Sequence, residues 1–320
     1  MSYVLLALVV VLSTGSIYVN NFVEVEEYTE KDIMQKYVNG KFIEVDGNNI
    51  FYQEFTTTSD KHVVIVGGTT AWSGTWENVI SEIKNESNIY ALDMPPFGYT
   101  KVKSDYNYTI ENQASIINKF IEEKKLKNVT LIAHSYGAGP LFESVFQNQK
   151  QFKKIIIVDG AIHVQLPFQE TILTNAFGNL IGIDAVKNIV VANTIHLPGF
   201  MRMSLESLTH QKDKVTQYWI DVYNEPLKQV GTSKKLANWF HDFVFENAHT
   251  GLSEKKENYK DMKVPVVLIW GDKDPLTPYA NALYLKEIIP NSKLYTLENV
   301  GHMPMIEESE MFINILKENI

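Results

Sequence analysis

The sequence predicts an α/β fold with a mostly parallel central sheet and helices on both faces. Three observations support this prediction: short apolar runs recur along the chain, amphipathic segments separate them, and one run ends directly in a serine, in LIAHSYGAG. Continuous apolar runs are typical of strands that are covered on both faces, as in a parallel sheet. Strands and helices in alternation define the α/β class.

The first strands should form a hairpin, because apolar and polar residues alternate on both sides of Asp46-Gly47-Asn48-Asn49. The later apolar runs predict the parallel strands. They are HVVIVGG, NIYALDM, VTLIAHS, KKIIIVDG, VPVVLIWG and KLYTLEN. Between the second and third runs, TIENQASIINKFIEEKK places its apolar residues on one helical stripe, which predicts a helix packed on the sheet.

No strand-like run appears between Gly160 and Val264, where Leu, Phe, Met and Trp recur at helical spacing instead. We therefore predict a helical cap over residues 162–261. It would be inserted into a core formed by residues 41–161 and 262–320.

Residues 1–21 carry no charge and include the apolar run VLLALVVVL. This run is slightly shorter than the ~20 residues that span a bilayer, and it lacks the basic start of a signal peptide. A membrane anchor, a secretion signal and a buried element of the fold are thus all open. The first two predict a membrane-anchored or secreted protein, with membrane association through this segment, and the third a cytoplasmic one. Residues 22–40, with VEVEEYTEKD, are predicted to form a polar linker.

The composition is that of an ordinary globular protein, with 45% hydrophobic and 21% charged residues. Acidic residues outnumber basic ones, 38 to 29, so we expect no nucleic-acid partner, because phosphate binding needs a basic face. The chain has no cysteine, which excludes disulfides and thiolate chemistry. The histidines in and near the cap lack a convincing ligand spacing, and we expect neither a metal nor a cofactor.

Ser135 is the candidate nucleophile. It follows an apolar strand, with Ala133 two residues before it and Gly137 two residues after it. A nucleophile elbow needs small residues at these positions, because strand and helix pass close together there. The alternative interpretation is that Ser135 has no catalytic role and only caps a helix N-terminus.

A serine nucleophile needs a general base, and the base needs an acid that orients it. WGDKDPLTP ends an apolar strand and presents Asp272 and Asp274, and VGHMPM follows the last strand and presents His302. The order Ser, Asp, His is that of the α/β-hydrolases.

Together with GGTTAWSGTW and LDMPPFGYT, these motifs resemble the α/β-hydrolase superfamily, in particular its members with a helical cap, over about residues 41–320. The resemblance implies a triad of Ser135, His302 and Asp274, in which the family pattern G-x-x-D sets the register from Gly271.

Two other aspartates, Asp159 and Asp272, occur near the ends of predicted strands. Asp159, in IIIVDGA, is a second candidate acid, because some members carry the acid after the preceding strand. Asp272 would face solvent or cap its loop. His134, beside the nucleophile, is expected to pack against the elbow or support it.

The resemblance also implies an oxyanion hole made by the backbone N–H groups of Thr69 and Tyr136. The family often begins the first of these loops with His-Gly, whereas this chain has Gly67-Gly68. We expect Gly68 and Trp72 to contact the substrate.

The implied activity is hydrolysis of a carboxylic ester, or of a related small-molecule carbonyl substrate, through an acyl-enzyme. A serine nucleophile is unlike the aspartate of the dehalogenases and epoxide hydrolases of this fold. Aminopeptidase and C–C bond hydrolase activities remain open, and Glu206, Asp221 and Glu225 of the cap could bind the ammonium of a peptide substrate. A non-catalytic ligand receptor of the same fold also remains open.

Overall fold

The computed structural model describes residues 14–15, 17–162, 184–245 and 251–320. Most of the predicted N-terminal segment and the start of the predicted cap therefore lie outside the described residues. Within those ranges, no helix combines the length and the apolar character needed to cross a bilayer.

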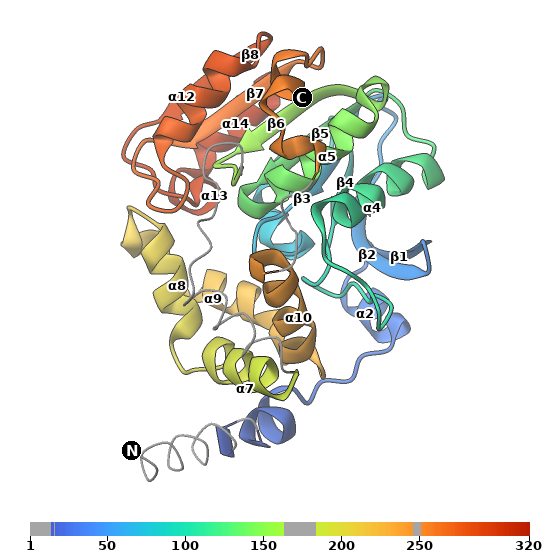
Figure 1. The fold of residues 1–320 in the computed structure, drawn as a ribbon, viewed down its shortest axis with the longest axis vertical. Helices are drawn as coiled ribbons and strands as arrows, with labels where there is room; N and C mark the ends of the chain where they lie inside the picture. The colour runs from blue at the N-terminus through green and yellow to red at the C-terminus, as the bar shows by residue number, and fades with distance from the viewer. Residues whose placement is uncertain (1–13, 16, 163–183, 246–250) are drawn as a thin grey trace.

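A mixed sheet forms the centre of the molecule, with the strand order β1-β2-β4-β3-β5-β6-β7-β8 in the described residues (Figure 1). The strands are β1 (Gly40–Val45), β2 (Asn48–Phe55), β3 (His62–Val66), β4 (Asn88–Leu92), β5 (Val129–His134), β6 (Phe152–Val158), β7 (Val266–Gly271) and β8 (Ser292–Leu297). β1 and β2 form the predicted hairpin, and all pairs from β4 to β8 are parallel. The predicted α/β class is confirmed.

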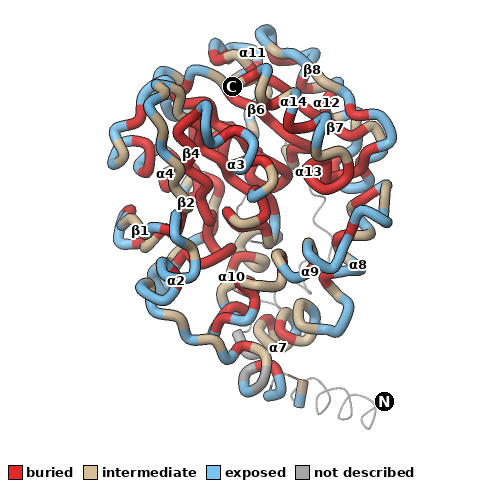
Figure 2. Tube along the Cα trace, turned by 180° about the vertical axis from the view of Figure 1, so that it is seen from behind, coloured by how far each residue is buried: buried red, intermediate tan, exposed pale blue. Residues whose placement is uncertain are grey.

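Helices cover both faces of the sheet, which explains the continuous apolar runs. On one face lie α4 (Ile110–Glu123), α5 (Ala138–Gln147) and α12 (Tyr279–Ile288), and on the other α3 (Glu77–Ile83) and α14 (Ser309–Asn319). Successive side chains of a strand point to opposite faces. Val64 and Val66 of β3 accordingly join the first core, and Val63 and Ile65 the second. Figure 2 shows the central strands buried, whereas the edge strands β1 and β8 are partly exposed.

The cap helices lie between β6 and β7 in the sequence, within the range predicted for the cap. They are α7 (Asp184–Ile195), α8 (Phe200–Leu208), α9 (Gln217–Asn224) and α10 (Thr232–Phe245), and they gather beside one end of the sheet (Figure 1). The remaining helices of the described ranges are short. They are α2 (Glu30–Lys36), α11 (Lys256–Lys260), α13 (Pro304–Glu307), the π-helix η1 (Val19–Val23) and the 3₁₀ turns η2 (Ser73–Trp76), η3 (Ser135–Gly137), η4 (Gln149–Gln151), η5 (Lys212–Lys214), η6 (Glu225–Lys228) and η7 (Leu252–Glu254).

The segment 22–40 differs from the polar linker that we predicted. It contains α2, which begins with a capping box between Thr29 and Asp32. Glu24 is buried and accepts the N–H groups of Gly231 and Ser233 at 3.1 and 2.8 Å. The first N–H groups of a helix have no partner within the helix. At the start of α10 they bind a carboxylate from the N-terminal segment. The segment is thereby attached to the cap.

Candidate active site

Ser135 sits on a strained turn between β5 and α5. Its φ angle is +50°, in the left-handed region that residues with a side chain rarely adopt. The turn is tight, because a Cβ atom on Gly137 would lie 2.6 Å from the carbonyl oxygen of Gly67. A side chain at position 137 would collide with backbone, which explains the small residue there. This geometry is that of a nucleophile elbow.

The structure brings the three predicted triad residues into one hydrogen-bonded row. Ser135 Oγ lies 2.8 Å from His302 Nε2, and His302 Nδ1 lies 2.8 Å from Asp274 Oδ2. All three residues are buried. Asp274 Oδ1 also accepts the N–H groups of Leu276 and Thr277, both at 2.8 Å. With its proton on Nδ1 facing Asp274, the imidazole presents Nε2 as an acceptor to the serine hydroxyl.

Opposing effects set the charge on Asp274. Burial alone would raise the pKa of this carboxyl, but the hydrogen bond and charge of His302 and the hydrogen bonds from Thr277 hold it below its ordinary value. Asp274 is therefore an anion beside the imidazole at neutral pH. It can stabilise the imidazolium that forms when His302 takes a proton.

Asp159, the second candidate acid, lies beside this row without bonding the imidazole. One of its oxygens accepts the N–H of Gly271 at 2.9 Å, and the other has no hydrogen-bond partner among the described residues. Burial, followed by the negative charge of Asp274, raises the pKa of Asp159 well above its ordinary value. Asp272 is partly exposed and accepts the N–H of Asn299 at 2.6 Å, so it caps its loop.

Asp159, Asp274 and His302 each place a potential ligand atom within 4.8 Å of the others. Both ring nitrogens of His302 already face hydrogen-bond partners, Ser135 on one side and Asp274 on the other. We therefore interpret the cluster as a hydrogen-bond network rather than as a metal site.

The backbone of His302 is held as firmly as its ring. Its N–H donates to the carbonyl of Leu208 at 2.8 Å, and its own carbonyl accepts Nε2–H of His134 at 2.8 Å. Burial, with the nearby His302, lowers the pKa of His134 to about 3, so this ring is neutral and can donate from Nε2. His134, the last residue of β5, thus holds the backbone of His302 from the strand that leads to the nucleophile.

Of the predicted oxyanion residues, Tyr136 follows the nucleophile directly, and Thr69 follows Gly68, which packs on the nucleophile. A Cβ atom on Gly68 would lie 2.7 Å from Ser135 Cβ and 3.3 Å from Ser135 Oγ, so Gly68 packs directly against the serine. Thr69 follows at the start of a turn in which Ala71 N–H donates to the carbonyl of Gly68 at 3.1 Å. Tyr136 follows Ser135 in η3.

An aromatic cluster surrounds the Tyr136 side chain. Its ring meets Phe97, Trp239 and Phe243 edge to face, with centroids 6.0, 5.4 and 5.2 Å away. Tyr136 Oη and Trp239 Nε1 are buried and bond no other group of the described residues, and burial raises the pKa of the phenol while the nearby Trp239 side chain partly offsets this effect. A buried unsatisfied polar group is costly, about 1–3 kcal/mol. The phenol O–H of Tyr136 is therefore the group of this cluster that is available to an acceptor atom of a ligand or a water.

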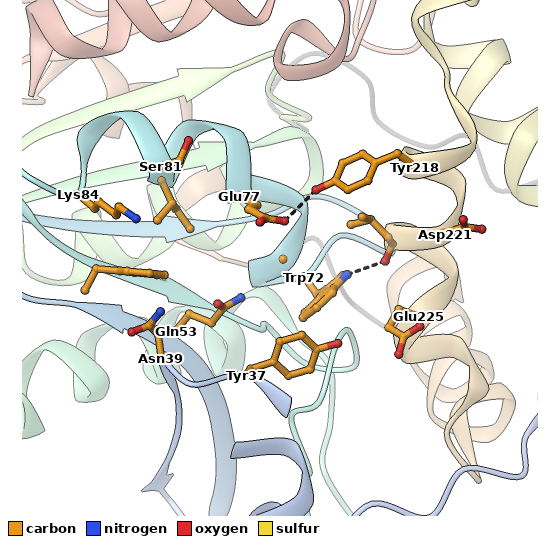
Figure 3. A pocket seen from close by; sticks show the side chains of 14 residues that line it. Tyr37, Asn39, Gln53, Trp72, Glu77, Ser81, Lys84, Tyr218, Asp221 and Glu225 are labelled. Atoms are coloured by element: carbon orange, nitrogen blue, oxygen red, sulfur yellow. Dashed lines mark hydrogen bonds between the residues drawn. The ribbon is translucent and has the colours of Figure 1, made fainter. Parts of the chain in front are cut away.

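Trp72, predicted to contact the substrate, packs instead in a separate core cluster with Ile33, Phe51 and Tyr99, and its Nε1–H donates to the carbonyl of Val222 in α9 at 2.9 Å. It forms part of an outer groove of about 530 Å³ (Figure 3). The triad is not among the residues that line this groove, which are Tyr37, Asn39, Gln53, Phe55, Trp72, Gly74, Glu77, Ile80, Ser81, Lys84, Tyr218, Asp221, Val222 and Glu225.

The three cap acids considered for an ammonium group have other partners. Asp221 and Glu225 line the outer groove, where Asp221 accepts Gln217 Nε2–H at 2.8 Å and Glu225 pairs with Lys36. Glu206 pairs with Arg202, one turn earlier in α8, at 3.3 Å.

Sequence reasoning missed two buried carboxylates that hold the loops of the site. Asp93 accepts the N–H groups of Ser73 and Tyr99 at 2.6 and 2.8 Å and so joins two loops next to the elbow. Glu307 accepts several N–H groups around His302. Only their places along the sequence could have indicated a role in the site. Asp93 follows a predicted strand in LDMPPFG, and Glu307 follows His302 by five residues.

The family model described as the alpha/beta hydrolase fold matches residues 61–309. An uncharacterized hydrolase, YugF of Bacillus subtilis, is 25% identical over 83% of this chain and 92% of its own length. A 2-hydroxy-6-oxo-2,4-heptadienoate hydrolase of Pseudomonas putida is 20% identical over 78% of this chain and 84% of its own. An esterase of Exiguobacterium antarcticum superposes with a TM-score of 0.68 at 21% identity, covering 87% of this chain and 98% of the esterase. The chain belongs to the α/β-hydrolase family.

Proposed function

We propose that the protein is a serine hydrolase that cleaves a carboxylic ester through an acyl-enzyme on Ser135. The hydrogen-bonded row of Ser135, His302 and Asp274 carries the proposal, because it supplies a nucleophile, a base and an orienting acid in contact with one another. An ester is the default substrate, since its alkoxide leaves more easily than the amine of an amide.

The chemistry would proceed in two halves. Ser135 Oγ attacks the ester carbonyl and passes its proton to His302 Nε2, while the N–H groups of Thr69 and Tyr136 receive the oxyanion. His302 then protonates the departing alcohol, which leaves the acyl group on the serine. Water enters, gives a proton to His302 and attacks the acyl carbonyl, so that the carboxylic acid departs and the serine recovers its proton. The sum is ester plus water to acid plus alcohol.

A fluorophosphonate probe and a series of p-nitrophenyl esters of graded acyl length test this proposal. We expect the probe to label wild-type protein on Ser135 and at least one ester to be hydrolysed. Ser135→Ala should lose both properties while remaining folded. Labelling that persists in Ser135→Ala, or turnover unchanged by it, would contradict the assignment.

A C–C bond hydrolase is the second candidate, and the buried phenol O–H of Tyr136, the residue that follows the nucleophile, favours it. This O–H can donate to an acceptor oxygen of the substrate, such as an oxo or carboxylate group of an oxo acid. The relative from Pseudomonas putida is named for such an acid. If this candidate is correct, 2-hydroxy-6-oxo-2,4-heptadienoate should be cleaved faster than any simple ester, and Tyr136→Phe should reduce only that reaction.

An aminopeptidase and a non-catalytic receptor receive less support from the site. Asp221, Glu225 and Glu206 bind neighbouring side chains away from the row, so we do not propose them as ammonium ligands of an aminopeptidase. A non-catalytic receptor would bind ligands but leave Ser135 unlabelled by the fluorophosphonate.

A further inference from the structure

We propose that Glu307 is a positioning residue. It holds the loop of His302 against the cap and so sets the distance between the imidazole and Ser135. The proposal rests on the function proposed above, since it assigns Glu307 a part in the reactivity of the serine. Glu307 itself makes no hydrogen bond to the three residues of the row.

Glu307 is buried in α13, with 2% of its surface exposed, and receives N–H groups from two separate segments. From the histidine loop, the N–H of Gly301 lies 3.0 Å from both carboxylate oxygens, and that of Met303 lies 3.3 Å from Oε1. From the cap, the N–H groups of His210 and Gln211 lie 2.8 and 2.9 Å from Oε2. The residues on both sides of His302 are therefore tied to the chain that leaves α8.

The two segments also touch directly. His302 N–H donates to the carbonyl of Leu208 at 2.8 Å. A Cβ atom on Gly301 would lie 2.6 Å from the backbone nitrogen of His210 and 2.7 Å from the oxygen of Leu208. Glycine at position 301 allows the backbone of the His302 loop to contact the backbone of residues 208–210. The carboxylate of Glu307 adds hydrogen bonds to both segments. A shift of the cap at residues 208–211 would consequently move the backbone of His302.

The donor pattern requires a carboxylate. Four N–H groups converge on the two oxygens of Glu307, and an ionised carboxylate is the side chain that offers only acceptors. A glutamine of the same length would turn an NH₂ group towards some of these donors and leave them unsatisfied. Glu307→Gln should therefore loosen the contact although it preserves the size of the side chain.

The test compares Glu307→Gln with wild type in the full chain. We expect the rate of Ser135 phosphonylation and kcat for the best ester to fall together by about 10- to 100-fold, the order of effect of a misplacement near 1 Å, with KM changed little. The downfield proton resonance of the His302–Asp274 hydrogen bond should shift or broaden. Glu310→Gln, on an exposed residue of the next helix, removes the same charge and should leave all these properties unchanged.

A second variant keeps the test decisive if Glu307→Gln fails to fold. Gln211 donates from its side chain to the carbonyl of Asn299 at 3.2 Å and to Glu308 at 3.1 Å, so Gln211→Ala weakens the same contact at a partly exposed position. It should lower the phosphonylation rate in the same direction by a smaller factor.

Three results bear on the two proposals separately. A folded Glu307→Gln that is phosphonylated at the wild-type rate would overturn the positioning role, as would an unchanged Gln211→Ala where Glu307→Gln does not fold. A fall in melting temperature without any change in kcat or in the downfield resonance would show that Glu307 contributes to stability only, and would contradict the positioning role. Wild-type protein that does not react with the probe would contradict the proposed function instead.

Discussion

Asp159 and Asp274 lie side by side behind His302, and only Asp274 bonds the imidazole. Asp274 Oδ2 is 2.8 Å from His302 Nδ1, whereas Asp159 bonds the N–H of Gly271 and leaves one oxygen without a partner among the described residues. Two buried carboxyls this close do not both ionise readily. Their pKa values are accordingly shifted in opposite directions, Asp274 downward and Asp159 upward.

Asp159→Asn should keep most of the activity, and its stability relative to wild type should increase as the pH rises. In wild type the folded state holds the proton of Asp159 more tightly than the unfolded state does, so its contribution is favourable at low pH and is lost above the unfolded pKa of about 3.9. An asparagine cannot ionise and avoids that loss. Urea unfolding should therefore show a stability difference that grows in favour of the variant between about pH 4 and about pH 7.

Asp274→Asn should behave in the opposite way. It should lower kcat/KM by about 10⁴-fold, since the imidazole loses the anion that fixes its tautomer. Because the pKa of Asp274 is depressed in the folded protein, its contribution to stability is present at neutral pH and lost as the pH falls through that depressed value. An active Asp274→Asn that becomes inactive only when Asp159 is also replaced would identify Asp159 as the functional acid.

Gly137→Ala and Gly139→Ala form a matched pair on the elbow. At position 137 the new Cβ would lie 2.6 Å from the carbonyl oxygen of Gly67, and at position 139 its nearest neighbour would be Ile110 at an ordinary 3.5 Å. We expect Gly137→Ala to cost about 1–3 kcal/mol of stability and most of the proposed hydrolase activity. Gly139→Ala should be near neutral in thermal melting and in turnover. Equal effects of the two substitutions would argue against a tight elbow.

Glu24→Ala should loosen the attachment of the N-terminal segment to the cap. The buried carboxylate accepts the N–H groups of Gly231 and Ser233 and bonds His196 Nε2 at 3.0 Å, so its removal leaves buried donors without partners. We expect a loss of about 1–3 kcal/mol in the free energy of unfolding. Glu27→Ala, on an exposed side chain of the same segment, is the control and should leave it unchanged.

The pH dependence of that loss gives a second check. Burial would raise the pKa of Glu24, but the bonds from His196 and Ser233 hold it below its ordinary value. The carboxylate therefore stabilises the fold at neutral pH, and this stabilisation is lost as the pH falls through the depressed pKa. The gap between wild type and Glu24→Ala should narrow in acid, and a gap that stays constant would contradict the assignment.

Features that depend on neighbours in the sequence could be predicted from it. The alternation around Asp46 predicted the hairpin, and the isoleucines from Ile110 onwards predicted α4, whose apolar stripe is buried as expected. Ser135 could be recognised because an elbow imposes its steric demand within two residues on either side. These patterns are local consequences of strand and helix periodicity.

Features that depend on distant contacts could not be predicted in this way. Trp72 was expected to contact the substrate, and nothing near it in the sequence indicated that its indole N–H would bond the carbonyl of Val222 in the cap. Glu24 was assigned to a linker because its neighbours are polar, yet the N-terminus of α10 draws it into the interior. Both partners lie far away in the sequence, so no local pattern carries the information.

The sequence by itself determined the class of fold, the elbow and the order in which nucleophile, acid and base follow one another, because each is encoded in a few consecutive residues. Only the tertiary structure decided which carboxylate meets His302, which one stays beside it with a raised pKa, and that Glu307 joins the histidine loop to the cap. Burial and hydrogen bonding between remote segments set those outcomes, since the charge of a carboxyl depends on what surrounds it in space rather than on its neighbours along the chain.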